Sequence, residues 1–153
     1  MSDKTMDDLA ELEAEFAREQ KGQGSLSPYI SGSPSARYVG FDIHPEDIEA
    51  LFFEGIGVPR WASIEAADLD EQNAIYMERY NEVMAQFPQI GRANDTFEGS
   101  AFLAEDIGPM LAECGKIISS ATSPKAVRAA KKFVIAGNKA AAEKAGLELR
   151  PRV

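Results

Sequence analysis

The feature that most constrains this chain is an apolar repeat in residues 103–118. Seven apolar side chains recur there at offsets of 0, 4, 7, 8, 11, 14 and 15, namely Leu103, Ile107, Met110, Leu111, Cys114, Ile117 and Ile118. This spacing places them on one face of an α-helix. Ser123-Pro124 then marks the start of a second helix, rich in Ala, Lys and Arg, which Gly146 ends. We therefore predict that these two helices form a hairpin at the core.

Upstream segments carry further helix signals. Pro45 begins a short helix, and residues 63–87 form a long helical candidate for which Asp68 or Asp70 is an alternative start. Residues 38–43 alternate like a short strand, but no partner strand is evident. A chain of 153 residues can bury a core without a disulfide or a metal. The sequence therefore predicts an all-α fold, a small irregular bundle of about four helices.

The first 36 residues differ in character from the rest. Residues 3–20 read as an amphipathic helix, and residues 22–36 are rich in Gly, Ser and Pro, which predicts a flexible linker. The apolar stripe of the helix consists of Met6, Leu9, Leu12 and Phe16. This helix either docks on its own body or inserts the stripe into a groove of another protein. We expect this helix to be flexible, and we divide the chain into the N-terminal helix and flexible linker (1–36), a helical core (37–146) and a tail (147–153).

The net charge of −9 conceals a division along the chain. Residues 1–114 carry 7 Lys and Arg against 23 Asp and Glu, whereas residues 115–153 carry 9 against 2. Such parts bind different partners, or they neutralise each other within the fold or between copies. Four cations share one stripe of the predicted last helix: Lys125, Arg128, Lys132 and Lys139. The stripe could face an acidic protein surface or a phosphate backbone.

Residues with distinctive chemistry are scarce. The chain has one His, His44, and one Cys, Cys114, which excludes an internal disulfide and a multi-cysteine zinc site. Cys114 lies on the apolar face of a helix and His44 at a helix start, so we interpret them as a buried small side chain and a helix-entry residue. Residues 108–116 fail as a phosphate-binding loop, because six residues instead of four separate the glycines. We predict no catalytic residue, no metal ligand, no cofactor and no small-molecule substrate.

Targeting signals are equally scarce. No apolar run approaches the roughly 20 residues that a membrane-spanning helix needs. The start of the sequence lacks the basic and apolar regions of a signal peptide. We expect a cytoplasmic protein that is neither exported nor membrane-bound, and association with a virion would also fit.

These observations favour a non-enzymatic protein–protein interaction or assembly factor. It would be a structural or adaptor subunit of a larger complex, such as a virion or secretion machine, with a protein partner or further copies of itself. The predicted partner-binding residues are Met6, Leu9, Leu12, Phe16, Lys125, Arg128, Lys132 and Lys139. The alternative is a nucleic-acid-binding protein that uses the basic C-terminal helix. It is less favoured because the acidic remainder of the chain would repel phosphates.

Overall fold

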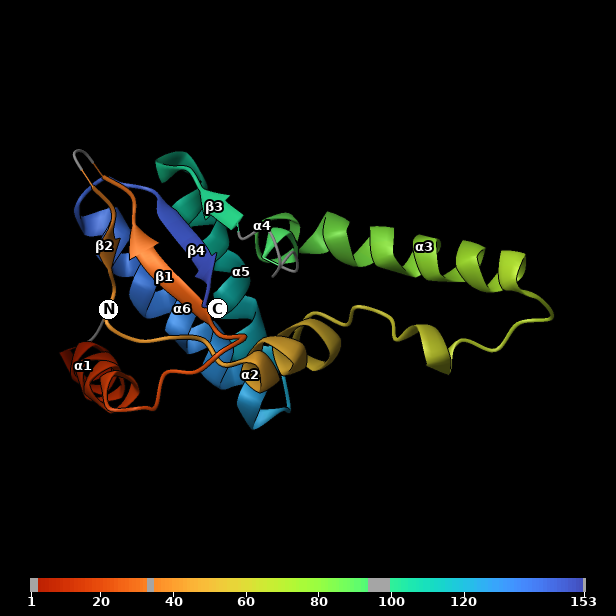
Figure 1. Ribbon diagram of the computed structural model, residues 1–153, viewed down its shortest axis with the longest axis horizontal. Helices are drawn as coiled ribbons and strands as arrows, with labels where there is room; N and C mark the ends of the chain where they lie inside the picture. Colours follow the sequence, from red (N-terminus) through yellow and green to blue (C-terminus); the bar gives the residue numbers. More distant parts are fainter. Residues whose placement is uncertain (1–2, 33–34, 94–99, 153) are drawn as a thin grey trace.

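The computed structural model describes residues 3–32, 35–93 and 100–152 (Figure 1). Its helices are α1 (Asp3–Ala17), α2 (Pro45–Ala50), α3 (Leu69–Gln86), α4 (Pro88–Arg92), α5 (Ile107–Ser120) and α6 (Pro124–Ala142). Its strands are β1 (Leu26–Ile30), β2 (Arg37–Tyr38), β3 (Ser100–Phe102) and β4 (Leu147–Pro151). A π-helical turn, η1 (Leu51–Gly55), extends α2, and two 3₁₀ turns are η2 (Trp61–Ser63) and η3 (Ala104–Asp106).

The prediction of an all-α fold is wrong, because the chain also forms a four-stranded antiparallel sheet. The strand order is β2-β1-β4-β3. β1 comes from the Gly/Ser/Pro-rich segment that we expected to be a flexible linker, and β4 comes from the expected tail. The two strands pair from Leu26 opposite Pro151 to Ile30 opposite Leu147. The fold is therefore mixed α and β, and its sheet joins segments that are far apart in the sequence.

The strands escape prediction because each is too short to carry a pattern. β4 alternates buried Leu147 and Leu149 with the more exposed Glu148 and Arg150, as a strand with one covered face does. This alternation lasts only five residues. β1 contains Pro28, and proline is depleted in strands because it lacks an N–H donor. Of the strand expected at 38–43, β2 and an isolated bridge between Leu26 and Ile43 are present.

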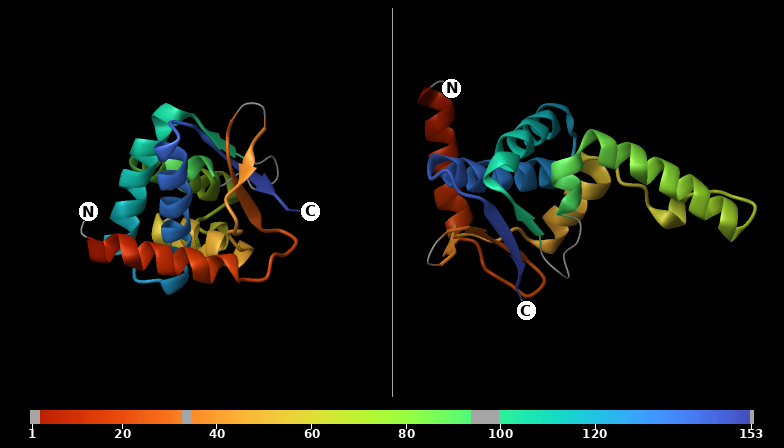
Figure 2. Two further views of the ribbon diagram at one scale, coloured as in Figure 1. Left: turned by 90° about the vertical axis from the view of Figure 1, so that its left-hand side faces the viewer. Right: turned by 90° about the horizontal axis from the view of Figure 1, so that it is seen from above.

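Helix α6 is the centre of the fold. The sheet lies on one side of it and α5 on the other, while α1 crosses it and α2 with η1 packs near its start (Figure 2). Small buried residues allow the close approach of these neighbours, including Ala126, Ala129, Ala130, Ala136 and Ala140. A Cβ at Gly137 would meet Met110 Cε at 2.8 Å and Leu111 Cδ2 at 2.9 Å, so α5 packs directly on α6. The predicted α5–α6 hairpin is therefore present.

Residues 59–87, called the arm from here on, project away from the body (Figure 1). The chain runs outward through η2 and returns through α3, whose 18 residues span about 27 Å. Asp68 is the N-cap of α3, since its carboxylate accepts the Glu71 N–H at 2.8 Å. Among the described residues, those of α3 that pack against the core lie in its C-terminal half, and they include Tyr80, Val83 and Met84. The distal half of the arm extends into solvent.

Candidate functional site

The predicted apolar stripe of the N-terminal helix lies where α1 crosses α6 (Figure 2). Phe16 is buried, with its ring centroid 5.7 Å from that of Phe41. Leu9 and Leu12 are half-buried and pack against the core. Met6 lies outside the residues whose side chains are described. The described part of the stripe therefore packs within its own chain.

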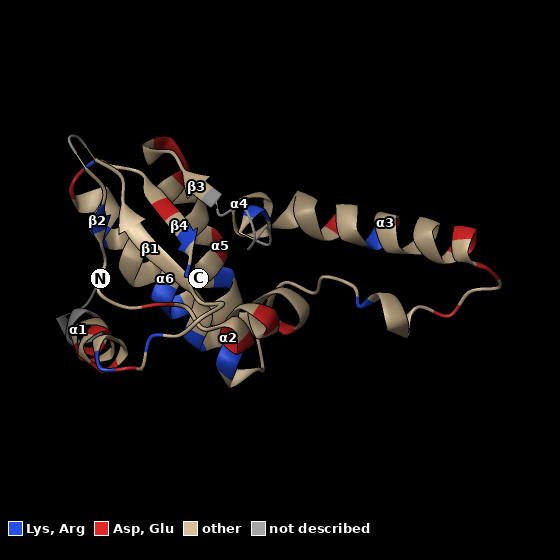
Figure 3. Ribbon diagram, viewed as in Figure 1, with Lys and Arg blue, Asp and Glu red and all other residues tan. Residues whose placement is uncertain are grey.

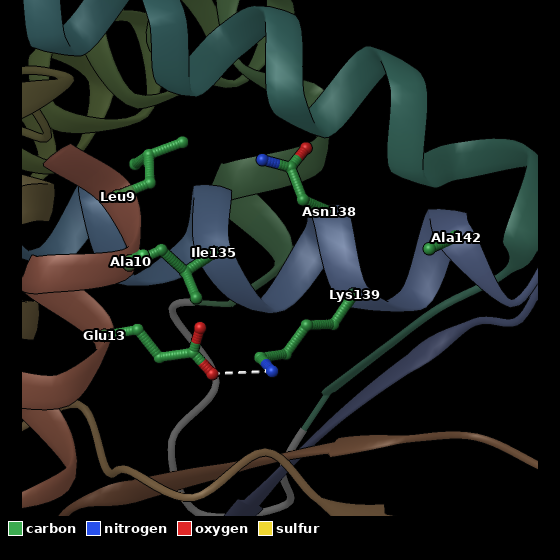
Figure 4. A pocket seen from close by; sticks show the side chains of 7 residues that line it. All are labelled: Leu9, Ala10, Glu13, Ile135, Asn138, Lys139 and Ala142. Atoms are coloured by element: carbon green, nitrogen blue, oxygen red, sulfur yellow. Dashed lines mark ion pairs between the residues drawn. The ribbon is translucent and has the colours of Figure 1, made fainter. Parts of the chain in front are cut away.

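Two cations of the predicted basic stripe form ion pairs near the ends of α6. Lys139 Nζ lies 2.6 Å from Glu13 Oε1 of α1 (Figure 4), and Lys125 Nζ lies 3.5 Å from Glu46 Oε2 of α2. All four side chains are partly exposed, so each pair contributes only about 0.2–1 kcal/mol to stability. The pairs nevertheless place an acidic group opposite each cation.

Arg128 and Lys132 occupy the centre of the stripe, near the end of α1. Lys132 is 0% exposed, and its Nζ donates to Glu19 Oε2 at 3.0 Å and to the carbonyl oxygen of Asp42 at 2.7 Å. The Arg128 guanidinium contacts the carboxylates of Glu19 and Asp47. The basic stripe is thus neutralised by acidic residues of the same chain, and Figure 3 shows these charges gathered around α6.

A buried carboxylate connects this cluster to the residue after β4. Asp42 accepts hydrogen bonds from Ser27 Oγ at 2.9 Å, from Tyr38 OH at 2.7 Å and from Arg152 Nε and Nη2 at 2.5 and 3.1 Å. Burial opposes ionisation, but the hydrogen bonds from Arg152, Tyr38 and Ser27 hold the pKa of Asp42 below its ordinary value. Burial and the bond to Asp42 raise the pKa of Tyr38. The carboxylate is fully engaged in holding these segments together.

Lysines with perturbed pKa values can act in catalysis, so the surroundings of Lys132 bear on that possibility. Burial lowers its pKa to about 8, while the nearby Asp47 carboxylate opposes the shift. Burial in turn raises the pKa of Asp47. The amine is fully covered and already donates to two oxygens, and it does not line the described pockets beside α1. The cluster is therefore a structural one.

Two open pockets flank α1 where it crosses the α5–α6 hairpin. One has a volume of about 370 Å³, and its only titratable lining side chains are Glu13 and Lys139, which face each other as an ion pair (Figure 4). The other, about 560 Å³, is mainly apolar and is lined by residues such as Leu111, Ile118 and Val134. The charged side chains among the described lining of the second pocket are Asp8 and Lys131.

Cys114 and His44 occupy the positions expected from the sequence. Cys114 is buried with its Sγ 3.7 Å from Met110 Sδ, and burial raises the pKa of the thiol. His44 precedes α2, with Nε2 3.0 Å from the carbonyl oxygen of Gln20. Within the described residues, no group of three or more His, Cys, Asp or Glu side chains is arranged to hold a metal ion.

Within the arm, three aromatic side chains pack in a row between η2 and α3. Trp61 of η2 packs edge-on against Tyr76 of α3, with ring centroids 5.6 Å apart, and Tyr76 stacks on Tyr80 at 5.9 Å. Gln72 Nε2 donates to the carbonyl oxygen of Trp61 at 2.9 Å. Aromatic pairs of this kind stabilise by about 0.5–1.5 kcal/mol beyond their area burial. These contacts hold the segment around η2 against α3.

Helical spacing also gathers the apolar residues of α3 on one face. At about 100° per residue, six of them fall within an arc of about 120°: Leu69, Tyr76, Met77, Tyr80, Val83 and Met84. Every residue of α3 is described, and none is buried. Leu69 is 72% exposed, Met77 43% and the neighbouring Trp61 42%. Exposed apolar patches mark interaction sites, so the distal arm is a candidate contact surface.

The importance of the arm is not evident from the spacing of apolar residues. Spacing predicts the helix in residues 63–87 and its apolar face, but it does not show what covers that face. One signal was available in the charges, because no Lys or Arg occurs between Trp61 and Glu78. Residues 38–59 and 93–115 also lack Lys and Arg, so this signal alone does not single out the arm.

No helix among the described residues is long and apolar enough to cross a membrane. Comparisons of the chain with protein-family models, with curated proteins and with solved structures found no match.

Proposed function

We propose that this chain is a non-enzymatic assembly protein, a structural or adaptor subunit of a larger complex, and that its arm contacts another protein. The observation that carries the proposal is the distal apolar face of α3, which the body leaves uncovered. Trp, Tyr and Met are enriched in the buried centres of protein interfaces, and the arm presents Trp61, Tyr76 and Met77. Full burial of one exposed Leu or Met side chain is favourable by about 1.5–3 kcal/mol.

The arm is a better candidate than the contact residues predicted from the sequence. Phe16 is buried on its own body, and the cations of the basic stripe already face carboxylates of α1, α2 and the segment after α1. A partner would have to displace these contacts before binding there. The same ion pairs favour a protein partner over the nucleic-acid alternative, because phosphates would have to compete with carboxylates for Arg128 and Lys132.

The proposal is tested by photo-crosslinking in the cells that produce the protein. A benzoylphenylalanine at position 77 replaces Met77 on the apolar face of the arm. We expect a discrete crosslinked protein adduct after irradiation, because a subunit interface buries this face. Mass spectrometry of the adduct identifies the partner and the segment that touches the arm.

The matched control places the same group at Glu82, an exposed residue about 140° around α3 from Met77. We expect little or no adduct from that position. Equal adducts from positions 77 and 82 would show non-specific collision, and no adduct at position 77 would contradict the proposal.

A further inference from the structure

The distal arm is strongly acidic as well as apolar. Between Trp61 and Glu78 there are five acidic residues and no basic one. The acids are Glu65, Asp68, Asp70, Glu71 and Glu78, and all are exposed. Figure 3 shows acidic residues at the tip of the arm. In the described part of the chain, none of the five forms an ion pair, in contrast to the paired charges around α6.

Local hydrogen bonds hold two of these carboxylates, those of Asp68 and Glu71, in place without neutralising them. Asp68 accepts the Glu71 N–H, and Glu71 Oε2 accepts the Ala67 N–H at 2.8 Å. Both bonds cap the start of α3, where negative charge also interacts favourably with the helix dipole. The tip therefore presents fixed negative charge beside exposed Trp61 and Leu69.

We infer, building on the proposed function, that the arm binds a basic amphipathic helix of a different protein. The exposed strip along α3 is apolar, which suits the apolar face of another helix packed along it. The acidic residues at the tip suit Lys or Arg residues beside that face. Apolar burial supplies the affinity, and charge complementarity selects the partner and its orientation.

The charge of the arm argues against the other occupants. A second copy docking side by side through the same face would bring two acidic arm tips together, and like charges in contact are unfavourable. A nucleic acid would bring phosphates to the same carboxylates. A basic protein segment is the occupant for which both the apolar and the charged residues of the arm are favourable.

The inference is tested with synthetic helical peptides that share one leucine face and differ only in their polar positions, which are Lys, Gln or Glu. Trp61 is the only tryptophan of the chain and lies on the arm, so its fluorescence reports binding. We expect the Lys peptide to shift the emission to shorter wavelength and to bind at least about tenfold tighter than the Gln peptide. Raising the salt from about 0.05 M to about 0.5 M weakens this binding roughly tenfold.

Variants and a scrambled peptide separate this site from general attraction to an acidic protein. The double variant Leu69→Ser, Met77→Ser keeps the charge of the arm and should lose at least about tenfold in affinity. Leu103→Ser removes an exposed leucine outside the arm and should bind as the unmodified chain does. A Lys peptide of the same composition without a leucine face should not shift the emission.

Three outcomes overturn the inference. They are equal binding of all three leucine-face peptides, no binding of the Lys peptide, or a salt-resistant dimer of the chain alone that is lost in the Leu69→Ser, Met77→Ser variant. Any of them can occur while position 77 still crosslinks in cells, in which case the proposed function stands and only the basic partner fails. A crosslinked partner segment with an excess of Lys and Arg supports the inference.

Discussion

Lys132 is a cation held out of water at the centre of α6. Its ammonium is satisfied by Glu19 and by the carbonyl oxygen of Asp42, and Asp47 adds a further negative charge nearby. A buried ion pair of this kind adds little net stability, because desolvation offsets the attraction. Loss of one partner is costly, since a charge is then left buried alone. Lys132 therefore fixes where α1 lies more than it strengthens the fold.

The lowered pKa of Lys132 gives a stability prediction with a definite sign. Burial places this pKa at about 8 in the folded chain, below the ordinary 10.5. Between these values the unfolded chain binds more protons, so the free energy of unfolding rises with pH. Relative to Lys132→Met, we expect the stability of the natural chain to rise by on the order of 2 kcal/mol from pH 8 to pH 10.5, allowing for solvent screening.

Urea unfolding of both proteins across this pH range measures the difference directly. The comparison with Lys132→Met removes contributions that both proteins share, such as the raised pKa values of Tyr38 and Cys114. Parallel stability curves for the two proteins would mean that Lys132 keeps an ordinary pKa in the folded state.

The polar cluster could not be predicted at the scale of single residues. Asp42 is held by Ser27, Tyr38 and Arg152, the last of which is 110 positions away in the sequence. Each residue alone has the character of an ordinary surface side chain. Only the pairing of β1 with β4 brings them together, and that pairing leaves no local pattern.

At the scale of elements, Gly146 after α6 has a different role from the one expected. Gly146 was predicted to end the helix, but α6 stops at Ala142 and Lys144 adopts the left-handed conformation, with φ 56°. A Cβ at Gly146 would lie 2.4 Å from the carbonyl oxygen of Phe102. The glycine therefore allows the chain entering β4 to approach the backbone of β3.

We expect Gly146→Ala to destabilise the protein by on the order of 2 kcal/mol, because a backbone oxygen cannot move aside as a side chain can. The control is Gly115→Ala in α5, where a Cβ meets nothing within 4 Å. Alanine should stabilise that helix by about 0.5–1 kcal/mol. Thermal unfolding of both variants checks the pair. If both substitutions changed the stability equally, the close approach of β4 to β3 at Gly146 would not explain the result.

The predictability of an element depends on its length and on what covers it. The α5–α6 hairpin follows from the sequence because long helices repeat their apolar pattern several times. The strands do not, because five residues or fewer hold too little pattern. The sequence predicted that α3 is a helix, but not that it projects away from the body. An apolar helix face has the same sequence pattern whether it packs against its own chain or against another protein.

At the scale of the whole molecule, the acidic and basic parts of the sequence meet inside one chain. Lys139 with Glu13, and Arg128 and Lys132 with Glu19, hold the end of the chain that carries α1 against α6. The division of charge noted in the sequence therefore contributes to intramolecular docking. The five acidic residues of the distal arm take no part in these pairs.

This arrangement predicts how the protein responds to salt. Raising the ionic strength from about 0.1 M to about 1 M shortens the Debye length from about 10 Å to about 3 Å. We expect amide exchange in residues 8–17 of α1 to quicken, roughly tenfold, because the partly exposed pairs weaken. Exchange in α5 serves as the internal reference and should change little. Salt-independent exchange in α1, or a sedimentation coefficient that falls with salt, would instead place the charge pairing between copies.

The position of β4 between β1 and β3 has a consequence for synthesis of the protein. β1 leaves the ribosome early, but its neighbour in the sheet, residues 147–151, is made long afterwards. Until then, among the described residues, β1 has only β2 and the bridge to Ile43 beside it, and Asp42 lacks Arg152. The α5–α6 hairpin does not depend on β4, since its contacts are local in the sequence. The partners of β4 are far away in the sequence, so a chain truncated before residue 147 would leave β1 paired only with β2 and Ile43 and would lack the strand that joins β1 to β3.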